Sequence, residues 1–278
     1  MVSLLCCTFK LSRQAYYQQS EIRLRTRFQI TMVVELVCEV RVRMPRIGGR
    51  KLYFLLQNDF ELLDYKLGRD KFFSLLREER LLVRPKKRAY KTTDSAHEHL
   101  VYPNLLKGLM LCRPFQAICV DITYIRLKEG FCFLSLATDI FSRCIIGWHL
   151  STTLEASGPI YALKEARLCM GWNAKGCIHH SDQGVQYCCY SYVSLLFRFK
   201  MLISMSDTGS PGQNAVAERV NGILKGELLL DGVFNRFPDA RSATEEAILI
   251  YNHERPHNSL GLLTPERFLK ENRITKYR

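Results

Sequence analysis

The chain of 278 residues lacks any run of about 18 or more apolar residues, the length that a membrane-spanning helix needs. Its opening, MVSLLCCTFKL, has no basic residues before the apolar ones and so lacks the pattern of a secretory signal. None of its eleven cysteines forms a C-x-x-C pair, and no internal repeat is apparent. These absences argue against a membrane protein, a disulfide framework and a zinc site. We expect reduced, mostly buried thiols.

Acidic residues are also in short supply. The chain has 40 Lys and Arg against 27 Asp and Glu, a formal net charge of +13. Residues 1–103 hold twenty basic and eleven acidic residues, whereas residues 104–278 hold twenty and sixteen. A basic N-terminal region joined to a more balanced one favours a polyanionic partner. The alternative is a basic protein whose charge serves only solubility.

The basic N-terminal region is predicted to be helical. A possible N-cap serine precedes helical residues 12–19, helical spacing continues through 21–44, and shorter helices are expected within 45–56 and 68–82. Short helices with exposed Arg and Lys suit a helix-turn-helix arrangement on phosphates. A plain helical bundle with a solvated basic face explains the pattern equally well. Residues 84–99 are polar and charge-dense and are typical of a basic linker.

From residue 116 the pattern changes to β-rich apolar runs. Three antiparallel strands are expected first, and alternating helices and strands follow them. The expected order is strands 117–127, 130–141 and 143–150, helix 155–170, strand 177–180, helix 185–199, strand 200–205, loop 206–213, and helices 214–230 and 240–254. This order predicts an α/β protein with a mixed sheet covered by helices.

Three carboxylates stand out along this half of the chain. Asp121 lies inside an apolar strand, Asp182 follows the short strand in CIHHSDQGVQY, and Glu218 lies early in a helix after a glycine-containing loop. Each alone has an ordinary explanation as a core acid, a helix cap or a solvent-facing side chain. Together they are the hard oxygen ligands that two Mg²⁺ ions need to clamp a phosphodiester. The adjacent His179 and His180 point to opposite faces of a strand, so they cannot easily share a metal.

The sequence motifs around these carboxylates resemble those of a known family. DITYI, HHSDQGVQY, NAVAERVNGILKGEL and YNHERPHNSLGLLTPERF, with thirty-five residues between Asp182 and Glu218, are similar to the DDE core of retroviral-type integrases and insertion-sequence transposases. SRQAYY, PRIGGRKLYFLL and GRDKFFSLLREERLLV extend the similarity to the N-terminal region. The chain is identified as a member of the OrfB transposases of insertion sequence family three, and the resemblance covers nearly its whole length.

The resemblance implies an RNase H-like integrase core preceded by a small helical region. It divides the chain into a DNA-binding-like region 1–83, a linker 84–110, a catalytic core 111–235 and a C-terminal helix and tail 236–278. Asp121, Asp182 and Glu218 would be catalytic and would bind Mg²⁺ or Mn²⁺, two ions in all. The implied chemistry is metal-dependent phosphodiester hydrolysis followed by strand transfer, with element ends and target DNA as substrates. No covalent protein–DNA intermediate is needed.

Further residues are expected to contact DNA. Lys225, two turns beyond Glu218 on the same helical face, would contact the DNA end, and the N-terminal region, with Arg13 and Arg46, would bind the terminal repeats. The motif YNHERPH would place Tyr251, Asn252, Arg255 and His257 near the active site or the DNA. Its alternative explanation is a helix terminus stopped by a proline. His180 would at most help to position substrate.

The resemblance also implies partners and a location. Such an OrfB chain is usually fused by frameshifting to an upstream OrfA, forms a homo-oligomer on DNA, uses no membrane, and acts in the bacterial cytoplasm at the nucleoid. Two competing functions are a catalytically silent OrfB-only protein that competes for element ends, and a nuclease of the RNase H-like group. The sequence departs from the family's pattern at Ile118, where a tryptophan is usual, at Phe115, where an asparagine is common, and at Gln213, where an acid is frequent.

Overall fold

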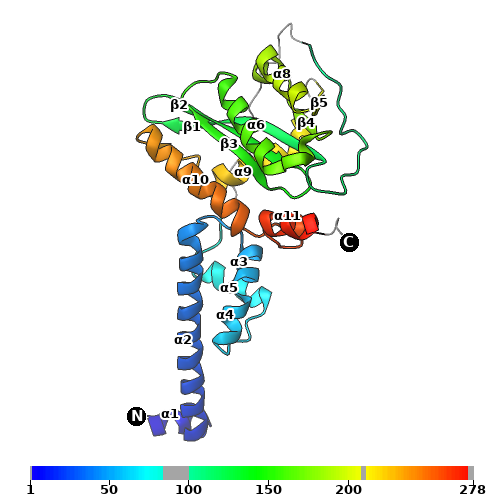
Figure 1. Ribbon diagram of the computed structural model, residues 1–278. Coiled ribbons are helices and arrows are strands. Elements are labelled where there is room, and N and C mark those ends of the chain that lie inside the picture. Colours follow the sequence, from blue (N-terminus) through cyan, green and yellow to red (C-terminus); the bar gives the residue numbers. More distant parts are fainter. Residues whose placement is uncertain (1, 84–99, 208–210, 275–278) are drawn as a thin grey trace. The chain divides into compact units, whose positions relative to one another are not determined.

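The computed structural model describes residues 2–83, 100–207 and 211–274 and divides into two compact units, residues 1–85 and 86–278 (Figure 1). The predicted linker segment 84–99 lies outside the described residues. The finer boundaries expected at residues 83, 110 and 235 remain predictions. No helix in the described part of the chain is long and apolar enough to cross a membrane.

The first unit is helical, as expected. It consists of α1 (Val2–Thr8), α2 (Arg13–Arg43), α3 (Gly49–Leu55), α4 (Gln57–Leu62) and α5 (Arg69–Glu78). The predicted N-cap is confirmed, because the side chain of Ser12 accepts a hydrogen bond from the backbone N–H of Ala15 at 3.0 Å. The two helical stretches predicted at 12–19 and 21–44 form one continuous helix, α2. The sequence analysis did not predict α1 or α4.

The core of this unit lies between the end of α2 and the three short helices. Val33 and Val37 of α2 are fully buried. Tyr53, Phe60 and Phe72 form an aromatic cluster with ring centroids 5.5 to 5.9 Å apart. The choice between a helix-turn-helix and a plain bundle remains a prediction.

The second unit is built on a mixed sheet with the strand order β3-β2-β1-β4-β5, and β6 also pairs with β1. Its strands are β1 (Ala117–Leu127), β2 (Phe131–Asp139), β3 (Ile145–Ser151), β4 (Ile178–Ser181), β5 (Leu202–Met205) and β6 (Val233–Phe234). The first three strands are antiparallel, as predicted, whereas β4, β5 and β6 run parallel to β1. Its helices are α6 (Ser157–Met170), η1 (Gly171–Ala174), α7 (Val185–Cys188), α8 (Tyr190–Arg198), η2 (Pro211–Asn214), α9 (Ala215–Gly226), α10 (Phe237–His253), η3 (Asn258–Leu260) and α11 (Pro265–Ile274).

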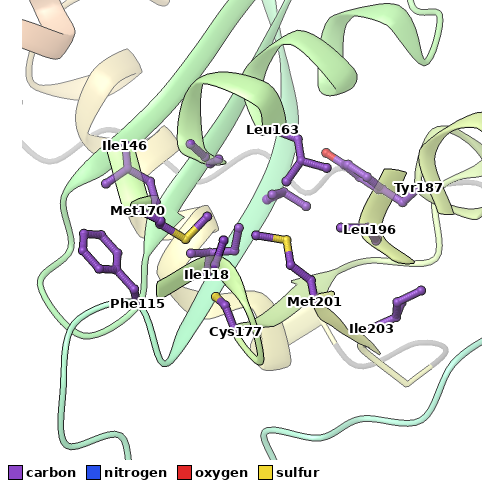
Figure 2. Close-up of a cluster of buried hydrophobic side chains, with 14 of the residues drawn as sticks. Phe115, Ile118, Ile146, Leu163, Met170, Cys177, Tyr187, Leu196, Met201 and Ile203 are labelled. Carbon is purple, nitrogen blue, oxygen red and sulfur yellow. The ribbon is translucent and has the colours of Figure 1, made fainter. Parts of the chain in front are cut away.

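The two faces of β1 have different roles. Ile118 and Val120 belong to a buried cluster with side chains of α6 and α8. Figure 2 labels Ile118 in this cluster, with Leu163 of α6 and Leu196 of α8. Because side chains alternate along a strand, Asp121 points to the opposite face, where α9 packs against β1. The sheet therefore separates the α6–α8 layer from the side that carries Asp121.

A glycine permits close packing of α6 on the sheet. A Cβ atom added to Gly147 of β3 would lie 2.2 Å from the carbonyl oxygen of Ala162 and 2.6 Å from the backbone nitrogen of Ala166. Both are backbone atoms that cannot move aside without shifting α6. Glycine at this position is therefore a packing requirement.

Some predicted elements differ in detail. The helix expected over 185–199 is divided into α7 and α8, because Cys189 between them has an extended backbone. The short strand β6 and the last helix, α11, were not predicted. The order of strands and helices in the sheet region is otherwise as the sequence analysis expected.

Candidate active site

The pairing of β1 with β4 determines where two of the three carboxylates lie. Ala117, Ile118 and Cys119 pair in parallel with Ile178, His179 and His180. Continuing this register by two residues places Asp182 opposite Asp121. Paired residues of neighbouring strands project to the same face of a sheet, so both carboxylates lie on the α9 side.

Helix α9 brings the third carboxylate to the same face. Asn221 of α9 donates a hydrogen bond from Nδ2 to Oδ2 of Asp121 at 2.6 Å, and Asn214 donates to the carbonyl oxygen of Val120 at 3.3 Å. Glu218 lies three residues before Asn221 and four after Asn214, so the three share one helical face. The side chain of Glu218 is exposed.

These two asparagines were not singled out in the sequence analysis. Asn214 and Asn221 are seven residues apart and bracket Glu218 in NAVAERVN. The signal that the sequence analysis missed is a pair of amides at helical spacing on either side of an acid. The structure buries both amides, and a buried amide needs a hydrogen-bond partner.

The electrostatics of the pair suit a cation. Burial, and secondly the carboxylate of Asp182, raise the pKa of Asp121 to about 7. The hydrogen bond from Asn221 opposes this rise, and the charge of Glu218 adds to it. Burial also raises the pKa of Asp182. A divalent cation would relieve the repulsion that the carboxylate of Asp182 exerts on the half-buried Asp121.

Asp182 is held by its own loop. Its Oδ1 accepts a hydrogen bond from the backbone N–H of Gly184 at 3.0 Å, the arrangement of an Asx-turn. Within the described residues no hydrogen bond reaches its Oδ2. One oxygen is thus used to orient the carboxylate and the other remains available to a ligand.

The set is incomplete as a metal centre in this conformation. Among the described residues, no three His, Cys, Asp or Glu side chains lie close enough together to hold one ion. The pair Asp121 and Asp182 fits a hard cation by its donor chemistry and its charge repulsion. The exposed Glu218 stands beside the pair.

Comparison with known proteins identifies the family of the chain. Two integrase core domain models match, one at residues 112–211 and one at residues 200–265. The chain is 31% identical over 272 residues to the insertion element IS600 uncharacterized 31 kDa protein of Shigella sonnei, covering 95% of this chain and 97% of the relative. It is 29% identical over 277 residues to the transposase InsF for insertion sequence IS3fB of Escherichia coli K12, covering 98% and 94%.

The chain belongs to the integrase-core transposases of insertion sequence family three. The family and the α/β fold class expected from the sequence are confirmed. The catalytic core domain of HTLV-2 integrase in complex with magnesium superposes with a TM-score of 0.45 at 20% identity, covering 56% of this chain and 97% of that one.

In this transposase the two adjacent histidines are structural. His179 Nε2 lies 2.9 Å from the hydroxyl of Tyr192, and His180 Nδ1 lies 2.9 Å from the hydroxyl of Ser204. Burial lowers the pKa of His179 to about 3 and lowers the pKa of His180. Both rings are therefore neutral near pH 7 and hold the end of β4 from which Asp182 projects.

The motif YNHERPH holds helix α10 against the sheet. Asn252 accepts a hydrogen bond from the backbone N–H of Ile145 at 3.0 Å and donates one to its carbonyl oxygen at 2.9 Å. Tyr251 donates to the carbonyl oxygen of Arg143 at 3.0 Å. Helix α10 ends at His253, as the helix-terminus explanation requires.

The predicted DNA contacts of Arg255 and His257 do not fit the structure. Arg255 is 1% exposed, and its guanidinium donates twice to the carboxylate of Glu227, at 2.8 Å each. His257 is 7% exposed and packs edge-on against Tyr251, with ring centroids 4.9 Å apart. A buried, doubly paired guanidinium is unavailable to a phosphate, so we correct these two assignments to structural roles.

The other predicted DNA contacts remain predictions. Lys225 is half-buried near the end of α9, Arg13 is exposed at the start of α2, and Arg46 is half-buried in the turn before α3.

Two of the three departures from the family's pattern lie in the core. Ile118 is fully buried in the cluster beneath α6. Phe115 is 1% exposed, has a φ of 58°, and donates its backbone N–H to Asp139 Oδ1 at 2.8 Å. Asparagine adopts this left-handed conformation more readily than phenylalanine does. Here Arg273 lies over the Phe115 ring, 4.5 Å from its centroid.

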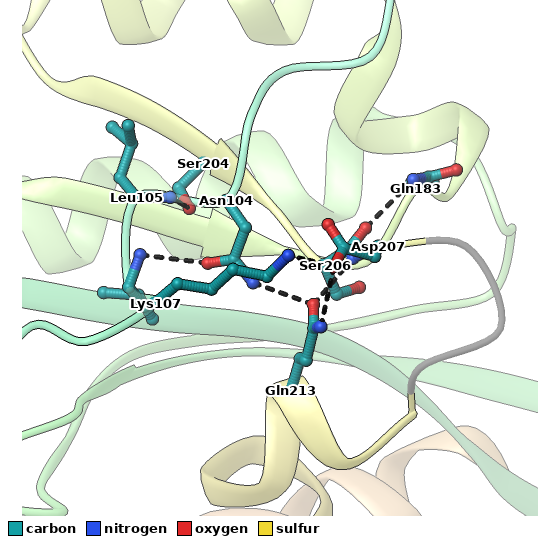
Figure 3. A network of polar contacts seen from close by, with 9 residues as sticks. Asn104, Leu105, Lys107, Gln183, Ser204, Ser206, Asp207 and Gln213 are labelled. Atoms are coloured by element: carbon teal, nitrogen blue, oxygen red, sulfur yellow. Dashed lines mark hydrogen bonds and ion pairs between the residues drawn. The ribbon is translucent and has the colours of Figure 1, made fainter.

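The third departure, Gln213, joins the loop before α9 to neighbouring segments (Figure 3). Its Oε1 accepts hydrogen bonds from Asn104 Nδ2 at 2.8 Å and from the backbone N–H of Asp207 at 2.7 Å, and its Nε2 donates to Asp207 Oδ2 at 2.9 Å. Lys107 pairs with the same Asp207 carboxylate. An acid at position 213 could not donate to Asp207, so glutamine suits this network.

Proposed function

We propose that this transposase uses Asp121, Asp182 and Glu218 to bind divalent cations and to cut and join DNA at the ends of its element. The proposal is carried by the parallel pairing of β1 with β4, which continued beyond Ser181 brings Asp182 opposite Asp121, and by the effect of the Asp182 carboxylate on the pKa of Asp121. Glu218 lies on the helix whose Asn221 binds Asp121. Membership of the transposase family supports the reaction class.

Magnesium or manganese ions, two in number, would activate the attacking oxygen and stabilise the leaving one. Asp121 and Asp182 would hold the ions from the sheet, and Glu218 would complete the ligand set from α9. Asn221 orients Asp121 through its hydrogen bond, and Gly184 orients Asp182. Because these two partners hold one oxygen each, the carboxylates of Asp121 and Asp182 are oriented before DNA arrives.

DNA is the expected partner, namely the terminal repeats of the element and a target duplex. Lys225 on α9 would contact the DNA end, and Arg13 and Arg46 would contact phosphates from the first unit. A homo-oligomer assembled on DNA and a fusion to OrfA are further parts of the proposal. The site of action would be the bacterial cytoplasm, at the nucleoid.

The test is cleavage and strand transfer on a labelled end of the parent element with Mg²⁺, using the chain alone and fused to OrfA. Asp182→Asn should abolish both steps, because an amide is a poor ligand for Mg²⁺. Glu129→Gln, which removes one exposed acid from the turn between β1 and β2, should retain activity. Binding of the ends without cleavage, by the wild type in both forms, would instead identify a catalytically silent binder.

A further inference from the structure

A basic cavity lies on the outer surface of α6, η1 and α8. Its volume is about 840 Å³, within the range of about 300–1,000 Å³ that small-ligand sites have. Eight residues line it, of which five are cationic and none is acidic. The cationic residues are Lys164, Arg167, Lys175, Arg198 and Lys200.

The described part of the chain does not neutralise these cations. Among the described residues, none of the five forms an ion pair with a carboxylate. Arg167 donates to the carbonyl oxygen of Gly171 at 2.5 Å, and its guanidinium lies over the ring of Phe199, 5.8 Å from the centroid. Five like charges gathered around one hollow create a positive potential that attracts a polyanion. A solvated basic face would explain the five cations but not the apolar and aromatic side chains that line the cavity with them.

Apolar and aromatic side chains accompany the cations in an exposed position. Trp172 is 95% exposed and Leu168 is 81% exposed, although both line the cavity. One helical face of α6 continues the surface, since Tyr161, Lys164 and Leu168 follow at helical spacing. The ammonium of Lys164 lies over the Tyr161 ring, 5.5 Å from its centroid. From Tyr161 to Leu168 this face runs about 10 Å along the helix.

The cavity is separate from the carboxylates. Helices α6 and α8 cover the face of β1 to which Ile118 and Val120 point. Asp121 points to the other face, where Asn221 of α9 binds it. A ligand in the cavity therefore does not touch the metal site.

We propose that this cavity binds an unpaired segment of DNA, with a base stacked on Trp172 and phosphates held by Lys175, Arg198 and Lys200. Single strands are bound by the combination found here, a positive groove with aromatic side chains on which bases stack. Duplex DNA buries its base faces and would leave Trp172 without a stacking partner. The inference deepens the proposed function, because it rests on DNA being the substrate.

The test uses the fact that the chain has two tryptophans. In a Trp148→Phe variant of the full chain, Trp172 is the single tryptophan reporter. An oligothymidylate of about twelve nucleotides, within the site sizes of single-strand binders, should quench its emission in a saturable manner. An abasic strand of the same length should bind more weakly and leave the emission unchanged. A duplex of the same length should quench less than the single strand.

Two variants and two controls locate the effect. In the Trp148→Phe background, Lys175→Glu combined with Lys200→Glu should weaken the quenching titration and lower its dependence on salt. Trp172→Ala, measured by anisotropy of a labelled strand, should weaken binding about 5- to 100-fold, the range for loss of one stacked base. Lys128→Glu and Tyr190→Ala, exposed residues of the same types outside the cavity, should change binding little.

Each outcome bears on one proposal. The inference is overturned, even if the enzyme cuts DNA, when the oligothymidylate does not quench the emission of Trp172. It is also overturned when the charge reversals at Lys175 and Lys200 leave the quenching unchanged. Equal quenching by the abasic strand overturns base stacking, and equal quenching by the duplex overturns the requirement for an unpaired strand. Stronger quenching by a poly-glutamate peptide than by DNA would assign the cavity to an acidic protein segment. Quenching by DNA in a chain that never cuts or joins it would leave the inference standing and remove the proposed function.

Discussion

Replacing Asp121 by asparagine should stabilise the second unit at alkaline pH in the absence of metal. In the folded chain the pKa of Asp121 is raised to about 7 from its ordinary value of 3.8, chiefly by burial and then by Asp182. Between these two values the native state holds a proton that the unfolded chain has released. The free energy of unfolding therefore falls as the pH rises through this window, and it stays lowered above pH 7.

The size of the effect follows from the same two values. The gap from 3.8 to about 7, at about 1.4 kcal/mol per tenfold change in proton affinity, sets a ceiling of about 4 kcal/mol. Because Asp121 is only half-buried, solvent screening reduces the expected gain to about 1–3 kcal/mol at pH 8. Asparagine remains neutral and still accepts the hydrogen bond from Asn221, so the variant and the wild type should be nearly equal at pH 4.

Urea unfolding followed by tryptophan emission, with EDTA and at several pH values, measures this difference. Trp148 and Trp172 both lie in the second unit, so the signal reports on that unit alone. Mg²⁺ should stabilise the wild type at pH 8 but not Asp121→Asn, since the ion relieves the repulsion only where both carboxylates are present. Equal pH dependence in Asp121→Asn and wild type would refute the reasoning, and Glu129→Gln should follow the wild type.

Three further predictions concern stability and positioning. Arg255→Met should destabilise the second unit by about 3–5 kcal/mol in urea titrations, because it removes the buried guanidinium that donates twice to the carboxylate of Glu227. An unchanged midpoint with weakened DNA binding would restore the predicted DNA contact. Gly147→Ala should destabilise by about 3 kcal/mol or more through its clash with α6, whereas Gly222→Ala, with nothing within 4 Å of the new Cβ, should stabilise by about 0.5–1 kcal/mol. Gln213→Ala should lower the cleavage rate several-fold by loosening the start of α9. The cleavage rate of Gln213→Glu should lie between those of the wild type and Gln213→Ala. Unchanged rates in both variants would show that this network does not position Glu218.

The local pattern of the chain determined much of the fold. The apolar run around Asp121 identified its strand, and the three antiparallel strands followed from short polar breaks between β-rich runs. Helix starts such as Ser12 were recognisable because a cap depends on residues only a few positions apart. The three carboxylates and the family were likewise found from motifs and spacing, since the words around Asp182 and Glu218 are specific.

The roles of the C-terminal motif were decided by tertiary structure. Arg255 and His257 occur in a motif that predicted DNA contacts, but folding buries both side chains. A guanidinium that can bind a phosphate can equally bind Glu227, and only packing decides between them. The basic cavity lined by Trp172 was likewise decided by tertiary structure, because its cations come from segments that no sequence pattern connects.

By itself the sequence determined most strands and helices of the sheet region and the family, and it singled out three acids as candidates for the chemistry. The tertiary structure decided which of these acids face one another, through the parallel pairing of β1 and β4, and which side chains remain open to solvent. The physical reason is that periodicity and motifs report on neighbours within a few residues, whereas register, burial and charge pairing depend on contacts between distant segments.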